Sequence, residues 1–247
     1  MIPPIVEDVS YGARRARAGE LPSRYADPWL GPFVDRLRPA LTSANTTILD
    51  VGSGRRPTIP RAWRASHTHY VGLDLAREEL DAAETGSYDE ILVSDIGSHA
   101  SELEGQFDLI VSWQVLEHVE DLGASLRNMH SYLRQGGRMV ALLSGSYAIF
   151  ALMSRVIPHR VNVSLMTRFL GAQPEDKFKT HYDKCSFRAL DAALSEWRDH
   201  EVVPLYRGAT YFSPWRPLER AYVAYEDWLV RTQRANLATH YLIVGDR

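Results

Sequence analysis

The stretch ILDVGSGRRP, residues 48–57, decides how this chain is expected to fold. An apolar run reaches Asp50 and is followed by Gly52 and Gly54, the pattern of a buried strand that ends in a glycine turn. Such a turn opens a ligand pocket at the carboxyl edge of a parallel α/β sheet. A dinucleotide-binding turn would carry a third glycine at position 57, where Pro57 stands instead. Because proline lacks a backbone N–H, we expect a ligand that needs close approach but no diphosphate cradle.

The composition is that of an ordinary globular protein. The chain has 247 residues, 45% of them apolar and 24% charged, with a net charge of −3. This charge gives no case for a nucleic-acid partner, and the single cysteine, Cys185, argues against a disulfide framework and a cysteine-based zinc site. The N-terminus lacks the apolar core of a secretory signal, and no apolar run reaches the ~18 residues of a membrane span. We therefore expect a cytoplasmic protein; the sequence leaves its oligomeric state open.

Strand-like and helix-like segments alternate along most of the chain. Apolar strands separated by helices predict a doubly wound parallel sheet covered on both faces, whose ligands lie where the strands end. We expect a single domain, 1–247, with an N-terminal helical cap at 1–44 and a lid inserted at 146–184 after the fifth strand. The seven expected strands cover residues 46–51, 69–74, 88–95, 107–113, 138–144, 201–208 and 239–246, and the expected helices cover residues 27–41, 76–84, 121–134, 185–197 and 216–234.

Acidic residues end the second and third expected strands. Asp74 lies 24 residues after Asp50, and a carboxylate at this place can accept both hydroxyls of a ribose. Asp95 can accept a hydrogen bond from the amino group of an adenine, with Ile96 beside the ring. Each aspartate is also a candidate N-cap of the segment that follows, so a purely structural role stays open for both.

Five motifs occur in order along residues 45–145: ILDVGSG, GLD, SD, FDLIVSWQVLEHV and YLRQGGRMV. In this order they resemble the class I S-adenosylmethionine-dependent methyltransferases, of the methyltransferase type 11 kind. The resemblance implies a Rossmann-like, seven-stranded α/β sheet, mostly parallel with an antiparallel last strand, and S-adenosylmethionine as cofactor. It also makes Arg24 a candidate to cover the methionine carboxylate. The cofactor-binding residues that it implies are Asp50, Gly52, Ser53, Gly54, Asp74, Leu75, Asp95, Ile96, Trp113 and Gln114.

The residues after the fourth strand carry the expected chemistry. Gln114, Glu117 and His118 form a Q-x-x-E-H pattern. It is similar to the E-x-x-E-H of ubiquinone-pathway O-methyltransferases, in which two acids and a histidine hold a divalent metal. Here glutamine replaces the first acid, and one carboxylate with one imidazole makes a poor magnesium site, so we expect no obligatory metal. His118 is a candidate general base because its ordinary pKa of ~6.5 suits proton transfer at neutral pH. His181, at the end of the lid, is a second candidate, and packing roles stay open for both.

The lid gives the strongest indication of the acceptor. Residues 155–188 carry seven lysines and arginines against three acids, a net charge of +4 in a chain whose total is −3. This suits an anionic small-molecule, glycan or lipid-linked acceptor, and also peripheral contact with a membrane; a solvated charged face explains it equally well. We expect O-methylation of a sugar, glycan or glycolipid hydroxyl. The alternatives are a nicotinamide-dependent oxidoreductase, which Pro57 argues against, and a catalytically inactive donor-binding module.

Overall fold

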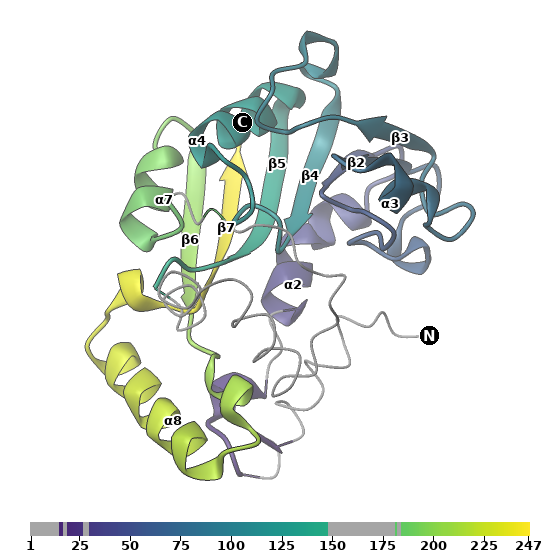
Figure 1. The fold of residues 1–247 in the computed structure, drawn as a ribbon. Helices are drawn as coiled ribbons and strands as arrows, with labels where there is room; N and C mark the ends of the chain where they lie inside the picture. Colours follow the sequence, from purple (N-terminus) through teal and green to yellow (C-terminus); the bar gives the residue numbers. More distant parts are fainter. Residues whose placement is uncertain (1–14, 17–18, 27–29, 148–180, 182–183) are drawn as a thin grey trace.

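The computed structural model describes residues 15–16, 19–26, 30–147, 181 and 184–247. Within them, seven strands form a single sheet in the order β3-β2-β1-β4-β5-β7-β6 (Figure 1). Neighbours from β3 to β5 are parallel, whereas β7 runs antiparallel to both β5 and β6. The predicted α/β class and its antiparallel last strand are therefore confirmed. The strands are β1 (Thr47–Val51), β2 (His69–Asp74), β3 (Glu90–Val93), β4 (Phe107–Trp113), β5 (Leu133–Ser144), β6 (Asp199–Leu205) and β7 (His240–Asp246).

Helices cover both faces of the sheet (Figure 1). On one face, Leu126 of α4 and Leu190 of α7 belong to the same buried core as Ile110 of β4. On the other face, Phe33 of α2 packs into a second core with Leu109. Successive residues of β4 thus enter opposite cores, as expected for a strand buried on both sides. The α-helices are α2 (Leu30–Leu41), α3 (Arg77–Asp81), α4 (Leu122–Tyr132), α7 (Phe187–Ala193) and α8 (Arg216–Arg231).

The chain between β1 and β2 contains no α-helix. Residues 52–68 form a loop with one short 3-10 turn, η2 (Arg61–Trp63), because Pro57 and Pro60 interrupt any helix that could start there. This agrees with the expectation from Pro57 that the turn offers no diphosphate cradle. Most of the expected lid, 146–184, lies outside the described residues.

Helix α8 extends beyond the carboxyl ends of β4 and β5, below the sheet in Figure 1. Two buried acids on its inner face anchor it. Glu219 accepts two hydrogen bonds from the guanidinium of Arg15, at 2.5 and 2.9 Å. Glu226 accepts hydrogen bonds from the hydroxyl of Tyr25 and from Arg24, the latter at 3.2 Å. Among the described residues, no helix has the length and apolar character needed to span a membrane.

Replacing Glu226 with alanine should destabilise the protein strongly. The change leaves Arg24, the hydroxyl of Tyr25 and the N–H of Gly208 without their shared buried acceptor. Breaking a buried ion pair from one side costs about 3–5 kcal/mol of unfolding free energy, measurable by urea titration. The matched control is Asp227→Ala, since Asp227 also pairs with Arg24 but its side chain is 44% exposed. We expect about 1 kcal/mol or less for the control; equal losses would contradict the role given to burial.

Candidate functional site

The carboxyl ends of β1, β2 and β4 meet at one edge of the sheet. In register, Asp50 of β1 pairs with Gly72 of β2 and with Val111 of β4. The order reverses at this point, because β2 and β3 lie on one side of β1 while β4 and β5 lie on the other. Open α/β sheets bind their ligands at such a reversal. The turn after β1 is therefore the centre of the candidate site.

Gly52 and Gly54 adopt backbone conformations that other residues avoid. Their φ angles are +72° and +49°, in the left-handed region that favours glycine. A Cβ on Gly52 would lie 2.4 Å from the methyl carbons of Val115, so a side chain does not fit there. The N–H of Gly52 donates to the carbonyl of Leu73 at 2.7 Å, which fastens the turn to β2. The turn thus brings backbone without side chains to this edge of the sheet.

The carboxylate of Asp50 holds the turn from beneath. It accepts hydrogen bonds from the hydroxyl of Tyr70 at 2.6 Å and from the hydroxyl and N–H of Thr58, both at 2.7 Å. The side chain has no exposed surface, and this burial raises the pKa of Asp50 to about 6. The sequence suggested direct contact with the cofactor. In the structure both oxygens bind the protein's own groups, so Asp50 supports the turn, and its contact with a cofactor stays a prediction.

Three residues that the sequence reasoning missed complete this support: Tyr70, Tyr88 and Arg64. Tyr88 donates its hydroxyl hydrogen to the carbonyl of Gly54 at 2.8 Å. Its ring stacks on that of Tyr70 with 6.0 Å between ring centres, and the guanidinium of Arg64 lies 3.4 Å from the centre of the Tyr70 ring. No motif marks Tyr88, which is 34 residues from its partner in the turn. The one usable signal is Gly72, where a Cβ would lie 2.7 Å from the Tyr88 ring.

Asp74 lies beside the glycine turn. Its Oδ2 accepts the N–H of Gly54 at 3.0 Å, and its Oδ1 accepts the N–H of Ala76, also at 3.0 Å. The structural role left open by the sequence is therefore present, because Asp74 fastens the turn and the start of the next segment. Each carboxylate oxygen still has a lone pair for a further donor. The neighbouring Leu75 is 69% exposed.

The remaining cofactor candidates differ in exposure. Asp95 is exposed, and its Oδ1 accepts the N–H two residues later at 2.8 Å. Ile96 is only 5% exposed and belongs to the apolar core, so its side chain does not lie on the open edge. Ser53 is buried as well. Trp113 is half-buried and packs edge-on against Phe33, with 4.9 Å between ring centres.

The half-buried Gln114 and the buried Glu117 both bind Ser144, which ends β5. Gln114 Oε1 accepts the hydroxyl of Ser144 at 2.8 Å, and Glu117 Oε1 accepts the N–H of Ser144 at 3.2 Å. Gln114 Nε2 and Glu117 Oε2 are both buried and have no hydrogen-bond partner within the described ranges. Burial raises the pKa of Glu117 to about 7. A buried donor and a buried acceptor at this edge match the needs of a single hydroxyl group.

Both candidate bases are neighbours of Glu117, one in the sequence and one through a backbone hydrogen bond. His118 directly follows Glu117, and the N–H of His181 donates to the carbonyl of Glu117 at 3.0 Å. Both histidines are half-buried. In the part of the chain that the structure describes, no group of three histidine, cysteine or acidic side chains is placed to hold a metal ion. The expectation of no obligatory metal stays a prediction that rests on Gln114.

Arg24 does not have the role suggested for it. Its guanidinium donates to Asp227 at 2.5 Å and to the carbonyl of Tyr206 at 3.0 Å, in addition to its contact with Glu226. These contacts commit Arg24 to anchoring α8. None of its contacts with described residues reaches the glycine turn, so the suggested role at the methionine carboxylate is corrected to a structural one.

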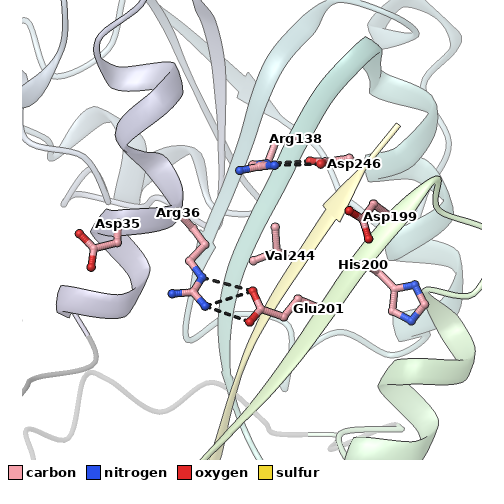
Figure 2. Close-up of a pocket in the computed structure, with 8 residues that line it drawn as sticks. All are labelled: Asp35, Arg36, Arg138, Asp199, His200, Glu201, Val244 and Asp246. Carbon is pink, nitrogen blue, oxygen red and sulfur yellow. Dashed lines mark hydrogen bonds and ion pairs between the residues drawn. The ribbon is translucent and has the colours of Figure 1, made fainter.

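The cavity in Figure 2 lies away from this site. It encloses about 360 Å³ between α2 and the end of the sheet where β6 begins and β7 ends. Two ion pairs cross it: Arg36 binds Glu201 at 2.9 Å, and Arg138 binds Asp246 at 2.7 Å. No predicted site residue lines it. The lining has four acids against two arginines, and both arginines are taken up by ion pairs between elements, which is typical of a structural contact.

Stability should depend on pH through Glu117. A buried acid whose pKa is raised from 4.5 to about 7 stabilises the fold fully at pH values below 4.5, and this stabilisation is lost as the pH rises through 7. Glu117→Gln keeps an acceptor for Ser144 but cannot ionise. Its unfolding free energy relative to the native chain should therefore increase by at most about 3 kcal/mol between about pH 5 and pH 8. Glu120→Gln is the control, since that side chain is 87% exposed. Parallel pH curves for E117Q and the native chain would refute this.

Known proteins share both the fold and part of the sequence. Among solved structures, a methyltransferase from Mesorhizobium loti superposes with a TM-score of 0.53 at 18% identity, covering 88% of this chain and 97% of the other. Geranyl diphosphate C-methyltransferase from Streptomyces coelicolor gives a TM-score of 0.54 at 16% identity, covering 92% and 80% of the respective chains. At these identities the likeness shows the fold alone.

In sequence, the ubiquinone biosynthesis O-methyltransferase of Vibrio parahaemolyticus is 30% identical over 97 residues, which are 37% of this chain and 41% of that protein. The chain thus matches less than half the length of this relative. The family model of a methyltransferase domain matches residues 21–190, most of the chain and the whole of the candidate site. With the strand order described above, the chain therefore belongs to the class I S-adenosylmethionine-dependent methyltransferases.

Proposed function

We propose that this methyltransferase binds S-adenosylmethionine at the glycine turn after β1 and transfers its methyl group to a hydroxyl oxygen. The turn carries this proposal, because Gly52 and Gly54 present bare backbone beside the carboxylate of Asp74. The turn is held by Asp50 and has no α-helix N-terminus behind it, which suits a ligand without phosphates. Pro57 is compatible with such a ligand for the same reason.

The donor-binding roles follow from exposure and from unused hydrogen-bonding capacity. Asp74 retains lone pairs for the ribose hydroxyls, and the exposed Asp95 offers an acceptor for the adenine amino group. Leu75 and Trp113 supply apolar surface beside them. Gln114 lies next to Trp113 on the side proposed for the sulfonium. The buried candidates, which shape the turn and its floor, are Asp50, Ser53 and Ile96.

The protein has two tasks in such a reaction. S-adenosylmethionine, when bound, supplies a methyl group on a positively charged sulfur, which leaves as a neutral thioether. The chain must align the acceptor hydroxyl and take its proton. We assign the proton to His118, with His181 as the alternative, since the backbone contact between His181 and Glu117 brings the two histidines to one region.

For the acceptor we propose a sugar, glycan or glycolipid-type hydroxyl, with an anionic or lipid-linked form favoured by the basic segment 155–188. The Vibrio relative supports oxygen as the methylated atom, because it is an O-methyltransferase, although its acceptor belongs to ubiquinone biosynthesis. The Streptomyces enzyme has this fold and methylates carbon, so the fold alone does not fix the atom.

The decisive experiment offers labelled S-adenosylmethionine with separate sugar, lipid-linked glycan and phenol acceptors, followed by identification of the product by NMR. An O-methyl sugar supports the proposal. An O-methyl phenol moves the acceptor toward that of the Vibrio relative, and an N- or C-methyl product defeats the O-directed assignment. Donor binding without transfer to any fraction of a cell extract would favour an inactive donor-binding module.

Asp74→Ala should weaken donor binding about 10- to 100-fold, because a hydrogen bond to a charged group contributes about 1.5–3 kcal/mol. Calorimetric titration with S-adenosylhomocysteine measures the change. Asp81→Ala on α3 is the control, since Asp81 is exposed and pairs only with Arg77 among the described residues. Asp74→Asn, which keeps an acceptor for the turn, separates ribose binding from support of the loop. Unchanged affinity in both Asp74 variants would remove the ribose assignment.

His118→Ala should lower kcat by about 10²- to 10⁴-fold without changing donor affinity, because it removes the proposed proton acceptor. Single-turnover assays against the acceptor identified above measure this. His181→Ala provides the comparison. Full activity of the first variant with loss in the second would transfer the base to His181, and full activity in both would show that alignment alone is sufficient.

A further inference from the structure

Helix α8 presents two faces of opposite character. Glu219, Tyr222, Glu226 and Leu229 recur every three or four residues and are all buried, so they form the inner face. The acids of this face are committed to Arg15, Arg24 and Tyr25, as described above. The outer face is exposed instead.

The outer face is an aromatic ridge, formed by Leu218, Tyr225 and Trp228. These side chains are 41%, 39% and 42% exposed. Tyr225 and Trp228 stack with 6.1 Å between ring centres, which makes the ridge continuous over a helical turn. Trp215, directly before the helix, is 59% exposed. So much aromatic surface on one exposed helix is unusual for a protein face that meets only water.

The charges beside the ridge are positive. Arg220 and Arg231 lie three turns apart on the same side of the helix, and neither makes an ion pair with a described residue. The guanidinium of Arg234 lies 5.9 Å from the centre of the Trp228 ring. The remaining acid of the helix, Asp227, pairs with Arg24. Cations therefore flank the ridge, and the acids of the helix itself are all engaged with Arg15, Arg24 or Tyr25.

A cavity continues this surface at the start of the helix. It encloses about 520 Å³ between α8 and residues 19–21, and Arg15, Arg216 and Arg220 line it together with Glu20 and Glu219. Three arginines against two acids leave it a net positive charge. Arg15 and Arg216 pair with those acids, which leaves Arg220 as the guanidinium placed to receive an outside anion.

We propose that this face of α8, residues 215–234, docks on an anionic lipid surface. Tryptophan and tyrosine favour the boundary between headgroups and acyl chains, and arginines beside them attract anionic headgroups. A second copy of the chain fits less well, because it would bring like charges together at Arg220 and Arg231. Helix α8 lies off the same edge of the sheet as the glycine turn (Figure 1), so a membrane there would border the candidate site. The proposal does not require the acceptor to be a lipid.

Co-sedimentation with phosphatidylcholine vesicles, with and without phosphatidylglycerol, tests this. The full chain should bind the anionic vesicles, and added salt should weaken the binding. Arg220→Glu with Arg231→Glu should reduce vesicle affinity at least fivefold per arginine. Tyr225→Ser with Trp228→Ser should abolish retention on the vesicles. The matched controls are Arg198→Glu, at the opposite end of the sheet, and Trp63→Ser, whose side chain is 39% exposed on η2; both should bind like the native chain.

A second measurement does not depend on the stability of those variants. Cys185 is buried, so a fluorophore on Ala224→Cys, in the exposed outer face, reports on that face alone. Its emission should shift to the blue with anionic vesicles, whereas the same label on Ala192→Cys of α7 should not respond. No binding of the native chain, equal binding to neutral vesicles, or an unresponsive label would overturn the proposal. A dimer disrupted by the Tyr225 and Trp228 changes would instead assign the face to a second copy, and capture by soluble polyanions alone would assign it to a soluble partner.

Discussion

The buried carboxylate of Asp50 is the constraint on which the candidate site depends. A carboxylate without exposed surface persists only where its oxygens are hydrogen-bonded, and here Tyr70 and Thr58 provide three bonds. They join β1, β2 and the loop between them at one point. Since no α-helix follows the turn, Gly52 and Gly54 would otherwise lose their fixed conformation to the freedom that glycine allows. The glycines leave the backbone accessible, and the hydrogen bonds of Asp50 restrict the conformational freedom that these glycines would otherwise have.

Other buried acids likewise fix contacts between elements at the carboxyl edge of the sheet. Glu117 connects the segment after β4 to Ser144 of β5, and Glu226 connects α8 to the N-terminal residues Arg24 and Tyr25. The interior of the sheet is specified by apolar packing, whereas its carboxyl edge is specified by a few buried polar contacts. Because burial raises the pKa values of Asp50 and Glu117 to about 6 and about 7, the edge responds to pH in a range where the apolar cores do not.

The sequence was sufficient for the sheet and for most strand ends, although β3 ends at Val93 and β6 at Leu205, two and three residues before the expected limits. Hydrophobic runs placed β2 and β4 at their observed limits, and the motif order indicated the family. It failed where a side chain's direction depends on contacts made across the fold. Ile96 follows a strand end, yet it turns into the core. Arg24 precedes the first helix, yet α8 supplies its partners from 200 residues away. Local patterns carry no information about such pairings, and Tyr88 beneath the glycine turn could not be found for the same reason.

The matches to known proteins cover only part of the chain, and this bears on specificity for the acceptor. The sequence match to the Vibrio relative covers 37% of the chain, and the family model ends at residue 190, before β6, α8 and β7. The residues proposed to bind the donor, in the turn and at or after the ends of β2 and β3, all lie inside the matched range. An acceptor that differs between members must be selected by segments that are free to vary. In this chain α8 lies beyond the end of the family model, and its inner acids fix its position while its outer aromatic and basic residues are exposed. Contact with a surface outside the protein gives those residues a physical reason to be exposed.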